Sequence, residues 1–141
     1  MSVLIDTSIC SLALRRKTAQ LSRAERRQVD EWKVLVSDGR ARLAGIIRQE
    51  VLSGIHDTRD FERLRERLVA FDDVSADTTD HEQAASCFNT YRAKGVTPTS
   101  FDVLICALAV RHGLAIFTTD ADFSHYAKIL PIRLHAVAAT G

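Results

Sequence analysis

Four acidic residues stand in apolar surroundings, and these are Asp6, Glu50, Asp102 and Asp120. Asp102 is the only charged residue in the run 101–110, whose composition predicts a helix that is buried on all sides. An isolated buried carboxylate is costly, so such groups are paired, hydrogen-bonded or bound to a metal. Carboxylates that lie together repel one another unless a cation is present, and Mg²⁺ and Mn²⁺ prefer carboxylate and water oxygens. The pattern predicts a hard-metal site if the fold brings the four residues together.

Each of these acids also has a simpler explanation in helix chemistry. Asp6 could cap a following helix, and Asp102, close to a helix start, could stabilise the helix dipole. Asp120 or Asp122 could cap a short helix in the same way, and Glu50 alone would most often be a solvated helix residue. Their joint occurrence at predicted strand ends and early helix turns favours the metal site.

Short apolar runs alternate with longer helical patterns along the chain. The strands and helices that these patterns predict would position the four acids. Strands are predicted at 3–5, 41–45, 72–75, 114–118 and 132–135. Helices are predicted at 8–16, 23–36, 46–53, 59–70, 79–94, 100–112 and 120–128. Strands separated by helices pair in parallel through right-handed crossovers. We therefore expect an α/β fold, a three-layer α/β/α sandwich whose mostly parallel central sheet has four to five strands. Residues 1–141 are expected to form a single domain, with its functional crevice beyond the carboxyl ends of the strands.

The composition excludes several classes of protein. Hydrophobic residues make up 46% and charged residues 26%, as in ordinary globular domains rather than disordered chains. A net charge of +1 argues against nucleic-acid binding by bulk charge alone. Cys10, Cys87 and Cys106 are far apart and predict buried free thiols in a reducing compartment. No apolar run approaches the about 20 residues of a membrane span, and no signal peptide is evident, so a cytoplasmic location is expected. The sequence holds no zinc-spaced Cys/His cluster, P-loop, GxGxxG or GxSxG.

Arginine outnumbers lysine by 15 to 4, and the basic residues gather at 15–17, 23–27 and 63–67. One interpretation is a solvated helix face with ion pairs at i,i+3, between Glu62 and Arg65. A second such pair is expected between Arg63 and Glu66. The other interpretation is contact with RNA phosphate or with an acidic partner segment, since Arg binds both groups through two parallel hydrogen bonds. Trp32 is expected in the core rather than at an interface.

Four segments together resemble the acidic motifs of PIN-domain nucleases. They are Leu4-Ile5-Asp6-Thr7-Ser8, Gln49-Glu50-Val51-Leu52-Ser53-Gly54, Asp102-Val103-Leu104-Ile105-Cys106-Ala107-Leu108-Ala109 and Thr118-Thr119-Asp120-Ala121-Asp122-Phe123. Each motif is weak alone, but their order, spacing and the chain length are similar to those of the VapC toxins of bacterial toxin–antitoxin pairs. The resemblance covers essentially the whole chain. It departs from the family pattern at Ser8, where Asn is common, and at Cys106, where Ala is common.

The resemblance implies a Mg²⁺- or Mn²⁺-dependent endoribonuclease. By motif match, the metal would be held by Asp6, Glu50, Asp102 and Asp120. Asp122 would be an accessory acid, and supporting hydroxyls would come from Thr7, Thr118 and Ser100. The resemblance also implies a homodimer, an RNA substrate and a small VapB-like antitoxin that covers the site.

Two other functions stay open. A catalytically inactive scaffold of the same fold would bind RNA or protein without cleaving RNA. Phosphoryl transfer at Asp6, as in receiver or haloacid-dehalogenase-like proteins, is a second possibility, but the latter need another Asp two residues on, where Ser8 stands. Labelling of Asp6 by a phosphoryl donor would distinguish this class from a nuclease.

Overall fold

A five-stranded parallel sheet forms the centre of the protein, for which a computed structural model describes residues 1–137. The strands are β1 (Val3–Ile5), β2 (Ala41–Ala44), β3 (Asp72–Val74), β4 (Ala115–Phe117) and β5 (Arg133–Leu134). Their order in the sheet is β3-β2-β1-β4-β5, and every neighbouring pair is parallel. The prediction of a mostly parallel sheet of four to five strands is therefore confirmed.

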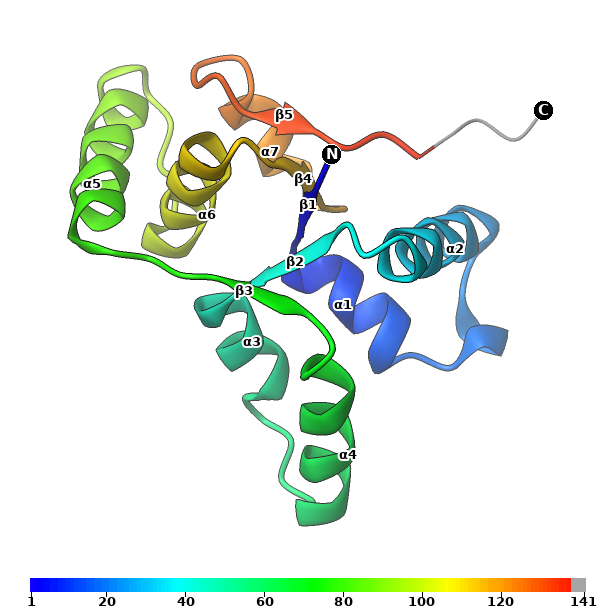
Figure 1. Cartoon of the computed structure of the whole chain (residues 1–141). Helices are drawn as coiled ribbons and strands as arrows, with labels where there is room; N and C mark the ends of the chain where they lie inside the picture. The colour runs from blue at the N-terminus through cyan, green and yellow to red at the C-terminus, as the bar shows by residue number, and fades with distance from the viewer. Residues whose placement is uncertain (138–141) are drawn as a thin grey trace.

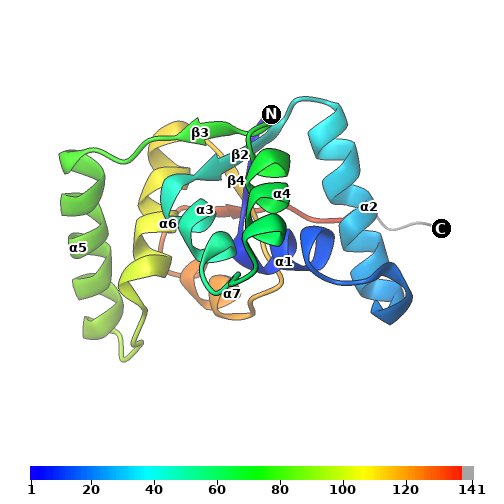
Figure 2. The same cartoon turned by 90° about the horizontal axis from the view of Figure 1, so that it is seen from below.

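Helices flank this sheet. They are α1 (Thr7–Leu14), α2 (Arg23–Ser37), α3 (Gly45–Leu52), α4 (Thr58–Leu68), α5 (Thr78–Ala93), α6 (Ser100–His112) and α7 (Asp122–Tyr126), with a short 3-10 helix at Thr18–Gln20. Figure 1 shows α5 and α6 together on one side of the sheet and α1 and α2 on the other, while α3 and α4 project away as a pair. The same separation is visible from below in Figure 2.

The core lies between the sheet and the helices that cover it. Strands β1 and β4 are buried along their whole length, which matches the continuous apolar runs of strands covered on both faces. Helix α6 is buried from Asp102 through Ala109, as its all-round apolar sequence predicted. Trp32 is 8% exposed and its ring centroid lies 6.1 Å from that of Phe71, so the prediction of a core tryptophan is confirmed. The three cysteines are buried and free, as expected.

Element ends differ from the sequence predictions by a few residues. The helix expected at 120–128 covers only Asp122–Tyr126, because Asp120 Oδ1 accepts a hydrogen bond from the backbone N–H of Asp122 at 2.9 Å and forms a turn before the helix. The last strand is the two-residue Arg133–Leu134 rather than 132–135. None of the helices in the part of the chain that is described has the length and hydropathy required to cross a membrane.

One of the two ion pairs expected on α4 is present in the structure. Arg65 donates to Glu62 at 2.9 Å, as predicted. The predicted pair of Arg63 with Glu66 is wrong, because Arg63 instead lies 3.6 Å from Asp60. In both observed pairs the acid precedes the base along the helix, the order that the helix dipole favours.

Gly113→Ala should lower the free energy of unfolding by about 1 kcal/mol. Gly113 caps the carboxyl end of α6 with φ +65°, a left-handed conformation in which a Cβ is strained although open space surrounds it. Urea unfolding measures the loss. Gly45→Ala is the matched control, since Gly45 also has open space but no positive φ, and it should be neutral or slightly stabilising. Equal effects of the two substitutions would contradict the role of backbone strain.

Candidate functional site

The candidate site lies at the point in the sheet where the order of successive strands reverses, next to β1. From β1 the chain proceeds to β2 and β3 on one side, and β4 and β5 then occupy the other side. Asp6 directly follows β1, and Thr118 and Asp120 follow the adjacent β4. Since these strands are parallel, their carboxyl ends meet at one edge of the sheet, which is where open α/β sheets bind ligands.

Asp6 is held by hydroxyl groups from both sides of this edge. It is 5% exposed, and its Oδ2 accepts hydrogen bonds from Ser8 Oγ at 3.0 Å and Thr118 Oγ1 at 2.7 Å. Its backbone N–H donates to the Phe117 carbonyl oxygen at 2.9 Å, which ties it to the end of β4. Asp6 occupies the N-cap position of α1, but its carboxylate makes no capping hydrogen bond. The carboxylate of Asp6 therefore does not act as a helix cap.

Asp102 lies in the first turn of α6, where its backbone N–H donates to the capping Thr99 Oγ1 at 3.0 Å. The Tyr126 hydroxyl donates to Asp102 Oδ2 at 2.8 Å. Burial raises the pKa of the Asp102 carboxyl above its usual range, and the neighbouring carboxylates of Asp120 and Asp6 raise that pKa further. Burial and the neighbouring carboxylates thus disfavour the ionised form of Asp102, and a bound cation would stabilise it.

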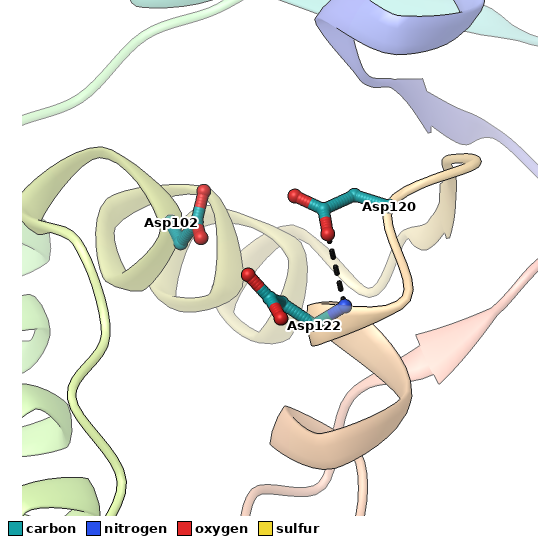
Figure 3. Close-up of side chains that lie close together, drawn as sticks. All are labelled: Asp102, Asp120 and Asp122. Carbon is teal, nitrogen blue, oxygen red and sulfur yellow. Dashed lines mark hydrogen bonds between the residues drawn. The ribbon is translucent and has the colours of Figure 1, made fainter.

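Three carboxylates converge at the start of α7. One oxygen each of Asp102, Asp120 and Asp122 can be chosen so that all three lie within 4.8 Å of one another. Figure 3 shows Asp102 on α6, Asp120 on the segment after β4 and Asp122 at the start of α7, with the hydrogen bond from Asp122 N to Asp120. The structure thus places Asp122, expected as an accessory acid, inside the closest group of carboxylates. Asp6 and Glu50 lie outside this group.

Glu50 belongs to the same electrostatic environment although it is exposed on α3. Partial burial raises the pKa of its carboxyl, with further increases caused by Asp6 and Asp102. The carboxylates of Asp6, Asp102 and Asp120 thus form one electrostatic environment with Glu50, which spans α3, α6 and the ends of β1 and β4. An exposed acid with a raised pKa is suited to accept a proton from a nearby water molecule.

The donor set fits a hard divalent cation. One oxygen of each of Asp6, Asp102 and Asp120 accepts a protein hydrogen bond, and within residues 1–137 the second oxygen of each accepts none. The carboxylates are thereby oriented while one oxygen stays available to a ligand. Three acids within 4.8 Å, with raised pKa values at Asp102 and Glu50, are the environment that Mg²⁺ or Mn²⁺ stabilises.

Of the three hydroxyl groups expected to support the carboxylates, those of Thr118, Thr7 and Ser100, only that of Thr118 contacts them among the described residues. Thr118 lies at the centre of the site, because its Oγ1 also accepts the backbone N–H of Asp120 at 3.0 Å. Thr7 Oγ1 is buried and has no hydrogen-bond partner within the described chain. Ser100 lines a hollow between α5 and α6 together with Phe88, and no hydrogen bond of the described residues joins it to the carboxylates.

Two residues that the sequence analysis did not propose contact the acids directly. Ser8 donates to Asp6 and accepts the backbone N–H of Thr119 at 3.0 Å, so it joins the ends of β1 and β4. Its place two residues after Asp6 could have suggested this role. Tyr126 contacts Asp102 across 24 residues of sequence, and no local pattern points to it.

Thr118→Val should lower the affinity of the protein for Mn²⁺ by about 10- to 100-fold, the usual cost of losing a group that orients a metal ligand. Valine keeps the shape of threonine but removes the hydroxyl that Asp6 and the backbone of Asp120 share. Isothermal titration calorimetry measures the affinity. Thr118→Ser keeps the hydroxyl and should retain most of the binding. Unchanged Mn²⁺ binding in Thr118→Val would show that this hydroxyl does not orient a metal ligand.

Comparison with known proteins assigns the chain to a family. Residues 3–129 match the family model of the PIN domain, so the chain belongs to the PIN-domain family. It is 34% identical over 131 residues to "Ribonuclease VapC11" of Mycobacterium tuberculosis, covering 90% of this chain and 92% of that protein. The "VapC ribonuclease Mb1587" of Mycobacterium bovis matches with the same identity and coverage. The protein is thus a PIN-domain protein related to the VapC ribonucleases, which confirms the resemblance seen in the sequence.

Solved structures share the fold at low sequence identity. VapBC2 from Rickettsia felis, bound to a DNA fragment from its promoter, superposes with a TM-score of 0.75 at 14% identity over 96% of this chain and 98% of that chain. FitAcB from Neisseria gonorrhoeae gives a TM-score of 0.73 at 22% identity over 94% and 96%. At these identities the likeness shows the PIN-like fold.

Proposed function

We propose that this protein is a metal-dependent endoribonuclease that hydrolyses RNA phosphodiester bonds, as the toxin of a toxin–antitoxin pair. The observation that carries the proposal is the group of three carboxylates within 4.8 Å at the carboxyl edge of a PIN-like sheet. The relatives that are 34% identical to this chain are named ribonucleases, which supports RNA as the substrate. Residues 1–141 would act as a single nuclease domain.

Asp6, Glu50, Asp102 and Asp120 would hold Mg²⁺ or Mn²⁺ together with Asp122, whose carboxylate stands beside those of Asp102 and Asp120. When bound, such an ion acidifies a water nucleophile and stabilises the charge that develops on the phosphodiester.

The protein's own residues prepare the site for this reaction. Ser8 and Thr118 fix the carboxylate of Asp6, and Tyr126 fixes that of Asp102, so little reorientation is needed when RNA arrives. Where Glu50 does not itself ligate the ion, its exposed carboxylate, with its raised pKa, would accept the proton of the attacking water.

The relationship to VapC proteins also supports two partners, an antitoxin and a second copy of this chain. The solved neighbours include "Toxin-antitoxin complex from Klebsiella pneumoniae", with a TM-score of 0.66 at 20% identity. A VapB-like antitoxin that covers the carboxylates would keep this protein inactive until it is released. The active form would be a homodimer that places two such sites along one face.

The test is cleavage of total cellular RNA by purified, antitoxin-free protein, with Mg²⁺, with Mn²⁺ and with EDTA. Discrete fragments that require the metal are expected, and their ends would identify the target. Metal binding without cleavage of any RNA in the pool would overturn the nuclease function and favour a non-catalytic scaffold of the same fold. Cleavage that persists in EDTA would contradict the metal-dependent mechanism.

A further inference from the structure

A basic groove lies between the end of α1 and the adjacent face of α4. Its lining residues are Leu14, Arg15, Lys17, Ile55, Asp60, Arg63, Leu64 and Arg67, and it encloses about 540 Å³. We name it the α1–α4 groove. In Figure 2 helix α4 lies in front, with α1 behind it, and in Figure 1 α4 lies below α1.

The groove concentrates positive charge. Its four basic residues face one acid, a local net charge of +3 against +1 for the whole chain. Arg63 lies 3.6 Å from Asp60, but both of these side chains are largely exposed, so the pair contributes little. Among residues 1–137, Arg15, Lys17 and Arg67 have no acidic group within 4.0 Å. These three cations are therefore free to bind an anion.

Two elements connect the groove with the carboxylate site. Helix α1 begins immediately after Asp6, and its last residue, Leu14, lines the groove. Eight helical residues span about 12 Å, so the groove is one short helix length from Asp6. Helix α3 carries Glu50, and Ile55, shortly after the end of α3, also lines the groove. A chain that passes the carboxylates along α1 or α3 therefore reaches the groove.

The charges and the floor of the groove fit single-stranded RNA. Leu14 and Ile55 are partly exposed and offer apolar surface to bases, while the guanidinium planes of the arginines can stack on bases or bind phosphate through two hydrogen bonds. The carboxylate site itself repels phosphate, so a substrate strand needs compensating cations beside the bond that is cut. An RNA substrate must extend beyond that bond, whichever protein partner is present. This favours RNA over an acidic protein segment as the occupant.

We propose that the α1–α4 groove binds the phosphates of single-stranded RNA that continues from the bond positioned at the carboxylates. The inference rests on the proposed ribonuclease function and adds the surface that would hold the substrate. Arg15, Lys17 and Arg67 supply the phosphate contacts. They position the substrate and take no part in the chemical step.

The test is the salt dependence of RNA binding. The protein carries Asp102→Asn so that RNA stays intact, and a fluorescently labelled single-stranded RNA of mixed sequence is titrated by anisotropy. Each phosphate contact of a single strand contributes about 0.7 to the slope of log affinity against log salt. The triple substitution Arg15→Gln, Lys17→Gln and Arg67→Gln should lower that slope by about 2. Between about 50 and 200 mM salt, the parent protein should then lose on the order of 20-fold more affinity than the triple variant.

The matched control removes the same charge elsewhere. Arg23, Arg26 and Arg27 are exposed on α2 and, within the described residues, make no ion pair. The triple Gln substitution of these residues should leave the slope unchanged. An unchanged slope in the groove variant, or equal losses in both triple variants, would overturn the proposal. Matching thermal unfolding of the two variants confirms that neither loses its fold.

A second probe separates RNA from an acidic protein segment. A fluorescent glutamate-rich peptide is titrated against the same variants. Loss of peptide binding in the groove variant, with RNA binding retained, would overturn the proposal in favour of an acidic peptide as the occupant. Failure of the proposed function would appear separately, as an absence of metal-dependent RNA cleavage by the unmodified protein.

Discussion

Asp102→Asn should reduce metal-dependent RNA cleavage by at least about 100-fold, since the loss of a residue that merely orients a metal ligand already costs about 10- to 100-fold. The substitution removes one carboxylate oxygen from the closest acidic group of the site. Asparagine keeps an acceptor for the Tyr126 hydroxyl, so the local hydrogen bond survives. The initial rate of cleavage in Mg²⁺ and in Mn²⁺ measures the effect, and calorimetry with Mn²⁺ should show weaker binding.

The fold should tolerate this change. Burial and neighbouring carboxylates disfavour the ionised form of Asp102, so a neutral side chain at this position should not lower the melting temperature of the metal-free protein. Asp30→Asn is the matched control, since Asp30 is exposed on α2, and it should retain full activity. Full cleavage by the double variant Asp6→Asn/Asp102→Asn would refute the assignment of the site.

The largest effect on stability is expected from Asp80→Asn, which should lower the free energy of unfolding by about 2–3 kcal/mol. Asp80 is 1% exposed on α5 and accepts hydrogen bonds from Arg111 of α6, Nε to Oδ1 at 2.5 Å and Nη2 to Oδ2 at 2.7 Å. The same arginine donates to the Ser75 carbonyl oxygen at 3.1 Å, so this one pair joins α5, α6 and the end of β3. An amide cannot accept the two-pronged contact of the guanidinium. The partial exposure of Arg111 keeps the loss below that of a fully buried pair.

The stabilisation by the Asp80–Arg111 pair should decrease as the pH falls. The hydrogen bonds from Arg111 lower the pKa of Asp80 to about 2 from its ordinary 3.8. The unfolded chain therefore takes up a proton first as the pH falls, and the stabilisation is complete above about pH 4 and is lost between pH 4 and pH 2. Urea unfolding of the parent and Asp80→Asn proteins should differ equally at pH 7 and pH 5, and less at pH 3.

Two variants test the interpretation of the Asp80 effect. Arg111→Lys keeps the charge but not the planar fork, and should cause an intermediate loss. Asp60→Asn changes an exposed acid and should have little effect on stability. A difference between the parent and Asp80→Asn proteins that stays constant down to pH 3 would show that Asp80 is not held ionised by Arg111.

The sheet and its parallel strand pairing could be predicted from the amino-acid pattern. Runs such as Val3–Ile5 and Ala115–Phe117 are apolar without interruption, a pattern of strands covered on both faces, and the helices between them require parallel pairing. Acids that follow such strands must meet at one edge of the sheet, which is why Asp6 and Asp120 could be assigned to one site. Glu50 and Asp102 stood out because each lies among apolar residues, and the resemblance to PIN domains, which the match of residues 3–129 bears out, joined all four acids in one expected site.

The hydrogen bonds that hold the acids depend on contacts between residues far apart in the sequence. Asp6 is bound by Thr118, 112 residues away, and Asp102 by Tyr126, 24 residues away. The structure also places Asp122 in the group of carboxylates within 4.8 Å, which includes neither Asp6 nor Glu50. It brings α1 and α4 together around three cations that have no acidic partner within the described chain. Propensity and periodicity act over a few residues, and they decide which face of an element is buried. The neighbours that a side chain meets depend on the crossing and stagger of packed elements, which no local pattern encodes.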